Sequence, residues 1–204
     1  MLIEDDVKLD YSDVLIRPKR STLTSRNDVE LSRTYTFYHS QKEWTGVPIM
    51  ASNMDTTGTF EMHGELSLHG LVTCIARHYN KDGMDWHLAE RRNKLCVMSG
   101  ISDKEILEIV GVANTYSDVS FVGLDVANGY TINFVESIKH LRNHLPNATI
   151  IAGNVVTADM TAELILAGVD IVKVGVGPGS VCTTRTKTGI GYPQLSAVLE
   201  CADV

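Results

Sequence analysis

Short apolar runs alternate with longer amphipathic stretches from residue 47 to the end of the chain. Each run is rich in β-branched and aliphatic residues, and a polar or glycine-containing segment follows it. The six runs cover residues 47–54, 71–77, 95–100, 121–127, 149–156 and 171–177. Continuous apolar runs of this length are typical of strands buried on both faces, so the pattern predicts six strands of a parallel sheet.

The stretches between the runs have the apolar spacing of helices. The predicted helices cover residues 58–69, 82–93, 103–116, 131–145 and 158–167, and another begins at Pro193. Ser102 followed by Glu105 predicts a capping box, and Gly168 stands where a C-terminal helix glycine is expected. The fourth helix carries one apolar stripe, which predicts packing on a sheet and consists of Phe134, Val135, Ile138, Leu141 and Leu145.

Strict alternation of strands and helices predicts a parallel sheet with right-handed crossovers, either doubly wound or closed as a (β/α)8 barrel. No strand-to-helix turn carries the GxGxxG pattern of a dinucleotide-binding fold. Nearly every strand ends in polar or reactive residues, as in barrel active sites; they are Asn53, Asp55, Arg77, Ser99, Asp125, Asn154 and, one loop later, Cys182. We therefore predict an α/β fold, a (β/α)8 TIM barrel of which this chain holds about six of eight units.

The domain organisation follows from that count. We expect residues 1–204 to form a single catalytic barrel domain that is C-terminally incomplete, with an N-terminal segment over 1–46 and barrel units one to six over 47–204. The last residues, GYPQLSAVLECADV, begin a helix and reach no glycine cap, proline or polar tail. No internal repeat or linker marks a second domain.

Charge and cysteine content narrow the class of protein. With 25 acidic against 18 basic residues the net charge is -7, which argues against nucleic-acid binding because a phosphate backbone selects clustered Lys and Arg. The start, MLIEDDVKLD, is acidic and leads into no long apolar run, so we expect no secretory signal, no membrane span and a cytoplasmic protein. The four cysteines are scattered without a CxxC motif, which predicts reduced thiols and neither a zinc site nor a disulfide framework.

The loop GVGPGSVCTTRTKTG, residues 175–189, carries the main candidate chemistry. Its glycines allow positive φ angles and a close approach of the backbone to a ligand or an ion; they are Gly175, Gly177 and Gly179. Cys182 follows in a polar loop with Thr183, Thr184 and Arg185, whose hydroxyls and cation favour a thiolate. This placement favours Cys182 as a nucleophile, and an inert loop thiol is the alternative.

Other polar residues have a functional and a structural interpretation. Asp125 in LDVANGY could orient a ligand or cap the turn that Asn128 begins, and Asn154 after IIAG is a similar case. His140 and His144 have the spacing of a metal-binding pair, but no Glu joins them as in HExxH, so a solvated helix face is favoured.

Taken together, the motifs resemble the family of IMP dehydrogenases and GMP reductases, and within it the reductases. The matching segments are DVKLDYSDVLIRPKRSTLTSR, GVPIMASNMDTTGTFEM, LDVANGY, IIAGNVVT and IVKVGVGPGSVCTTRTKTGIGYPQLSAVLECAD, and the similarity covers essentially all residues. The reductases are favoured because HYNKDGMDWHLAERRN leaves no room for the dehydrogenases' regulatory insertion. DVANGY and TTRTKTGIGYPQ also follow the reductase pattern.

This resemblance implies an activity and its residues. Cys182 would attack C2 of the GMP base, ammonia would leave, hydride from NADPH would release IMP, and Thr184 would relay protons. The implied cofactor contacts are Arg77, Asp125, Val126, Ala127, Val176 and Gly177. Potassium would bind at Gly177, Gly179, Cys182 and Arg185. Ser25 and Arg26 would reach the cofactor of a neighbouring subunit in a homotetramer.

The chain departs from the family pattern in two ways. Arg77 stands where the family has lysine, and an arginine cannot release a proton as an ammonium can. The last two strands, the phosphate-binding loops and a catalytic glutamate of the family have no counterpart in these residues. The alternatives are therefore an IMP dehydrogenase-like oxidoreductase, or a catalytically inactive fragment of the family.

Overall fold

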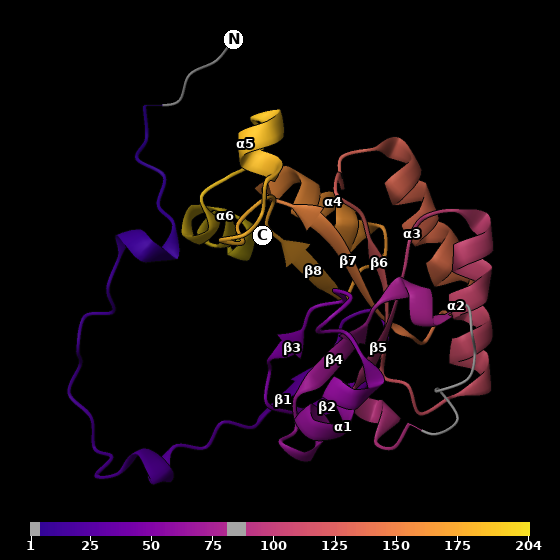
Figure 1. Cartoon of the computed structure of the whole chain (residues 1–204), viewed down its shortest axis with the longest axis horizontal. Coiled ribbons are helices and arrows are strands. Elements are labelled where there is room, and N and C mark those ends of the chain that lie inside the picture. The colour runs from indigo at the N-terminus through magenta and orange to yellow at the C-terminus, as the bar shows by residue number, and fades with distance from the viewer. Residues whose placement is uncertain (1–4, 81–88) are drawn as a thin grey trace.

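Six parallel strands form one sheet, ordered in space as they are in sequence. The computed structural model describes residues 5–80 and 89–204. The strands are β3 (Met50–Ala51), β4 (Val72–Ile75), β5 (Leu95–Ser99), β6 (Phe121–Asp125), β7 (Thr149–Val155) and β8 (Ile171–Val174). A doubly wound sheet reverses its strand order midway, whereas this one runs in one direction from β3 to β8 and curls (Figure 1). The sheet is thus a six-stranded part of a barrel, and the prediction of a barrel rather than a doubly wound sheet is confirmed.

Helices follow the strands and cover the outer face of the sheet (Figure 1). They are α1 (Phe60–Leu68), α2 (Asp103–Thr115), α3 (Ile132–His144), α4 (Ala158–Leu166) and α6 (Gln194–Ala202). The predicted capping box starts α2, where the Glu105 N–H donates to Ser102 Oγ at 3.3 Å. Gly168, just after α4, has a φ of +113°, as its place in the sequence indicated. Most of the helix predicted over 82–93 lies outside the described residues, and its described end holds only a short 3-10 turn, Arg92–Lys94.

The core has two parts because side chains alternate across each strand. Between the sheet and the helices, the predicted stripe of α3 is buried, with Phe134, Ile138 and Leu141 all at 0% exposure. The other faces of the strands point into the barrel and form a second cluster, made of Trp44, Val72, Cys74, Cys96, Met98, Phe121 and Ile151. This filled interior leaves the carboxyl ends of the strands as the open edge.

An antiparallel hairpin, which the apolar pattern did not indicate, closes the opposite end of the barrel. Its strands are β1 (Arg33–Thr36) and β2 (Glu43–Gly46). Trp44 from β2 and Phe37 from the turn both pack edge-on against Phe121, with ring centroids 5.8 Å away. Phe121 is the first residue of β6, so the hairpin covers the amino ends of the strands.

The residues before the hairpin form an extended arm. Apart from the 3-10 turns Tyr11–Asp13 and Arg26–Asp28, residues 5–32 form no regular element and run away from the barrel (Figure 1). Leu15 and Ile16 on this arm are 98% and 96% exposed. Only the part around residues 8–10 returns to the body of the molecule, where it contacts α6.

Candidate active site

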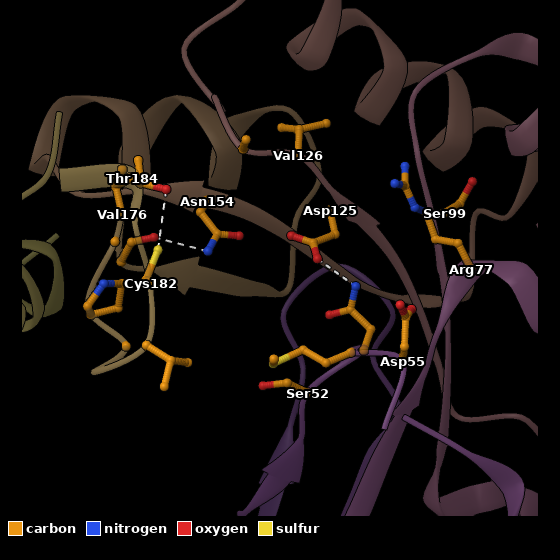
Figure 2. A pocket seen from close by; sticks show the side chains of 18 of the residues that line it. Ser52, Asp55, Arg77, Ser99, Asp125, Val126, Asn154, Val176, Cys182 and Thr184 are labelled. Atoms are coloured by element: carbon orange, nitrogen blue, oxygen red, sulfur yellow. Dashed lines mark hydrogen bonds between the residues drawn. The ribbon is translucent and has the colours of Figure 1, made fainter. Parts of the chain in front are cut away.

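The carboxyl ends of the strands surround a cavity of about 1240 Å³ (Figure 2). Because parallel strands present their carboxyl ends at one edge, side chains from distant parts of the chain meet here. The predicted strand-end residues that line it are Asn53, Asp55, Arg77, Ser99, Asp125, Asn154 and Cys182. Thr184, Val126, Ala127, Val176, Gly177 and Gly179 also line it. The sequence therefore identified most of this surface.

Cys182 lies exposed in the loop between β8 and a short helix, α5 (Thr184–Thr188). Its Sγ is 3.3 Å from Thr184 Oγ1 (Figure 2). The Thr184 hydroxyl, then the Thr184 N–H, and more weakly the Arg185 guanidinium, hold the pKa of the Cys182 thiol below its usual value. An accessible thiol with a lowered pKa is the condition for a nucleophile, so the geometry favours this interpretation over an inert thiol.

Three of the four glycines in residues 175–189 adopt conformations that other residues avoid, and Gly189 at the end of α5 is one of them with a φ of +70°. Gly175 has a φ of +140° and Gly177 a φ of +68°, whereas Gly179 is not in the positive-φ region. A Cβ added at Gly177 would lie 2.9 Å from Arg185 Cγ. The glycines thus let the backbone of the loop fold closely over the Arg185 side chain.

Asp125 at the end of β6 belongs to a polar cluster. Its Oδ2 accepts a hydrogen bond from Asn53 Nδ2 at 2.6 Å and lies 3.1 Å from Lys173 Nζ. Lys173 Nζ also donates to Asn53 Oδ1 at 3.1 Å. The hydrogen bond of the following turn is made by Asn128, which accepts from Tyr130 N–H, so the alternative of Asp125 as a turn cap does not fit. The carboxylate faces the cavity with its charge balanced.

Sequence reasoning missed Lys173, although the sequence carried a signal. A lysine in the middle of the apolar run IVKVGVG is rarely buried without a partner. The partner could not be read from the sequence, because Asn53 lies 120 positions away.

Two further groups at the cavity lack hydrogen-bond partners. Asn154 Nδ2 donates to the Gly175 carbonyl at 3.0 Å, but Asn154 Oδ1 is buried and unpaired among the described atoms. The Ser99 hydroxyl at the end of β5 is likewise buried and unpaired. Buried polar atoms are nearly always paired, so these two are exceptions within the described part of the chain.

Arg77 reaches the rim of the cavity rather than its centre. Its guanidinium lies 3.7 Å from the Glu105 carboxylate. The Arg77 side chain is more than half exposed. Arginine at this position therefore pairs with the capping residue of α2, while Lys173 supplies the cation at Asp125.

Other residues singled out from the sequence lie away from the cavity. Ser25 and Arg26 sit on the exposed arm, where Ser25 Oγ accepts from the Asn27 N–H, and neither lines the cavity. The Arg185 side chain runs behind the loop to Asp10. His140 and His144 are exposed on α3, and no group of three or more His, Cys, Asp or Glu side chains able to hold a metal occurs in the described part of the chain.

A curled parallel sheet with its polar cavity at the carboxyl ends defines a barrel protein of the (β/α) class. Residues 8–204 match the family model "IMP dehydrogenase / GMP reductase domain", and the chain belongs to this family. It is 53% identical over 206 residues to "GMP reductase 1" of Homo sapiens and 55% identical over 205 residues to "GMP reductase" of Caenorhabditis elegans. Each match covers 98% of this chain, and 59% and 57% of the relatives.

A solved structure supports the fold. The inosine 5' monophosphate dehydrogenase of Legionella pneumophila superposes with a TM-score of 0.78 at 27% identity, covering 97% of this chain and 60% of that one. The chain therefore spans about three-fifths of the length of the proteins it matches. Among its described helices none has the length and apolar character needed to cross a bilayer.

Proposed function

We propose that the full-length protein is a GMP reductase, which converts GMP and NADPH to IMP, ammonia and NADP⁺. The observation that carries the proposal is the thiol of Cys182, exposed on the cavity wall beside Thr184, in a chain 51–55% identical to named GMP reductases. The pairing of an accessible nucleophile with a hydroxyl that lowers its pKa matches the first step of the reaction.

The chemistry balances with these residues. The Cys182 thiolate would form a bond to C2 of the purine, the bond from C2 to the exocyclic amino nitrogen would break, and that nitrogen would leave as ammonia with a proton that Thr184 relays. This leaves a thioimidate between Sγ and C2. When bound at the cavity, NADPH would supply the hydride that reduces C2; the S–C bond would then break and Cys182 would return to the thiolate as IMP leaves.

The cavity of about 1240 Å³ beside the thiol supports our proposal that a dinucleotide binds there. Asp125, Val126 and Ala127 at the end of β6 line the cavity together with Val176 and Gly177, and we assign the cofactor to this surface. The Asp125 carboxylate, held by Lys173 and Asn53, would accept a hydrogen bond from a ligand hydroxyl or amide.

The loop also suits a monovalent cation, for which potassium is our proposal. Backbone carbonyl oxygens are the ligands such ions take. The carbonyls of Gly179 and Arg185 each accept one hydrogen bond, from the N–H of Cys182 and Gly189, and each keeps a lone pair. With those of Gly177 and Cys182 they would hold the ion and stiffen the loop under the thiol.

Ser25 and Arg26 are assigned to the cofactor site of a neighbouring subunit. The exposed arm carries them away from the cavity of their own chain (Figure 1), which supports a contact in an oligomer, and we propose a homotetramer. Sedimentation of the full-length protein tests the assembly.

The test of the activity uses the full-length protein with GMP and NADPH. Wild type is expected to form IMP, ammonia and NADP⁺ in equal amounts. Cys182→Ala is expected to lose turnover, and Thr186→Val, which alters an exposed side chain outside the cavity lining, to keep it. Unchanged turnover in Cys182→Ala would contradict the mechanism.

IMP dehydrogenase activity is the second candidate, because the superposed Legionella structure is a dehydrogenase. It predicts oxidation of IMP with NAD⁺ to XMP by the same cysteine. Formation of XMP without any reduction of GMP would replace the first proposal with this one.

A further inference from the structure

Residues 8–10 of the exposed arm are tied to α6 and to Tyr192, which follow the loop that carries Cys182. The Leu9 N–H donates to Ser196 Oγ at 2.8 Å, and the Ser196 N–H donates to the Leu9 carbonyl at 3.1 Å. The Lys8 ammonium lies 5.7 Å from the centroid of the Tyr192 ring. These contacts join positions more than 180 residues apart and place Asp10 between the loop and α6.

Asp10 uses both of its carboxylate oxygens there. Oδ2 lies 2.9 Å from Arg185 Nη1, and Oδ1 accepts from the Gln194 N–H, the first of α6, at 2.5 Å. Hydrogen bonds from Arg185 and Gln194 hold the pKa of Asp10 below its usual value, so the carboxylate is charged at neutral pH. A negative charge at the amino end of α6 also suits the helix dipole.

Arg185 links that carboxylate to the thiol. It is the second residue of α5 and lies three positions after Cys182. Its second guanidinium nitrogen, Nη2, donates to the Tyr192 carbonyl. Its aliphatic part fits against the glycine backbone, since a Cβ at Gly177 or Gly191 would lie 2.9 Å or 2.5 Å from Arg185 Cγ. A side chain held so closely transmits a change at its tip to the loop.

We propose that Asp10 is a positioning residue: through Arg185 it fixes the loop of residues 176–189 and thereby the place of Cys182 at the cavity. No comparison assigns Asp10 a role, and it does not line the cavity itself. The expected effect of Asp10 on catalysis rests on the proposed function, whereas its expected effect on the loop of residues 176–189 does not.

The test substitutes Asp10→Asn in the full-length protein. Because a charge-assisted hydrogen bond is lost, we expect faster hydrogen exchange in peptides from residues 176–189 and a changed rate of Cys182 alkylation by iodoacetamide. We also expect the kcat for GMP reduction to fall about tenfold, with a smaller change in the KM for GMP. Asp6→Asn removes the same charge from an 82% exposed side chain and is expected to change none of these. If Asp10→Asn has the same hydrogen-exchange rates and the same kcat as the wild-type protein, the proposal is overturned.

Two further variants separate positioning from general stability. Asp10→Glu keeps the negative charge, so we expect it to exchange more slowly in residues 176–189 than Asp10→Asn does. This comparison holds even if Asp10→Asn has a lower melting temperature than the wild-type protein. In a double-mutant cycle, the Asp10→Asn/Arg185→Gln variant is expected to have the same kcat and exchange rates as Arg185→Gln alone. If the effects of the two substitutions on kcat and exchange simply add, the proposal is overturned. If wild type fails to reduce GMP, the proposed function fails, while exchange and alkylation still decide the role of Asp10.

Discussion

At the scale of single residues, exposure and a lowered pKa coincide at Cys182. Cys74, Cys96 and Cys201 are buried, and burial raises the pKa of the Cys201 thiol. Cys182 is accessible, and the Thr184 hydroxyl and N–H stabilise its thiolate. The four cysteines of the chain therefore differ in exposure and thiol pKa through their surroundings, and these surroundings favour Cys182 as the nucleophile of the proposed function.

Thr184→Val is expected to raise the pKa of Cys182, because the hydroxyl is the largest cause of its lowering. A higher pKa means less thiolate at neutral pH, so the alkylation of Cys182 should slow at pH 7, while the rates converge at alkaline pH. The pH dependence of iodoacetamide labelling measures this.

Thr186→Val is the matched control, since the Thr186 hydroxyl donates to the Thr183 carbonyl and not to the thiol. Identical pH profiles for Thr184→Val and wild type would show that the hydroxyl does not control the thiol.

Lys173→Met is expected to weaken cofactor binding. It removes the ammonium that lies 3.1 Å from Asp125 Oδ2 and leaves the carboxylate with Asn53. Losing a hydrogen bond to a charged group predicts about a tenfold rise in the KM for NADPH. Lys139→Met, on the exposed face of α3, should leave KM unchanged, and an equal KM in both variants would refute the role of Lys173.

At the scale of elements, α3 buries one apolar stripe against the sheet. On α3 the stripe packs under β6, and so it supports the strand that ends in Asp125. A change on the buried face therefore alters stability, whereas the opposite face of the same helix is tolerant.

Ile138→Ala is expected to lower the free energy of unfolding by about 2–5 kcal/mol, because the side chain is fully buried and its removal leaves a cavity. Urea unfolding of the full-length protein measures the loss. His140→Ala, two positions along on the exposed face, should stay within about 0.5 kcal/mol of wild type. Equal losses in both variants would argue against the packing of α3 described above.

At the scale of the whole molecule, the curled sheet is open at both sides. The strand order begins at β3 and ends at β8, and neither strand has an outer neighbour among the strands described. Unpaired strand edges expose N–H and C=O groups that pair readily with other chains.

Residues 1–204, expressed alone, are therefore expected to self-associate. Analytical ultracentrifugation at several concentrations measures this, with the full-length protein as the control. A monomer that melts in one cooperative transition by circular dichroism would contradict the expectation and show that this part of the barrel folds independently.

The sequence by itself determined the strands, their order and the main chemical group of the site. Strand runs such as 121–127 and the stripe of α3 are local patterns, set by burial within one element, and the structure contains them where predicted. Cys182, Asp125 and Asn154 could be singled out because parallel strands end at a common edge, which makes a one-dimensional pattern into a site.

Only the tertiary structure decided which side chains meet. Three contacts join segments that lie 48 to 175 positions apart in the sequence. They are the contacts of Lys173 with Asp125 and Asn53, of Asp10 with Arg185, and of Trp44 with Phe121. No periodicity encodes such pairs, because the partner is chosen by the curl of the sheet and the path of the arm. The balanced charge at Asp125 and the tie between Asp10 and the cysteine loop therefore became visible only in three dimensions.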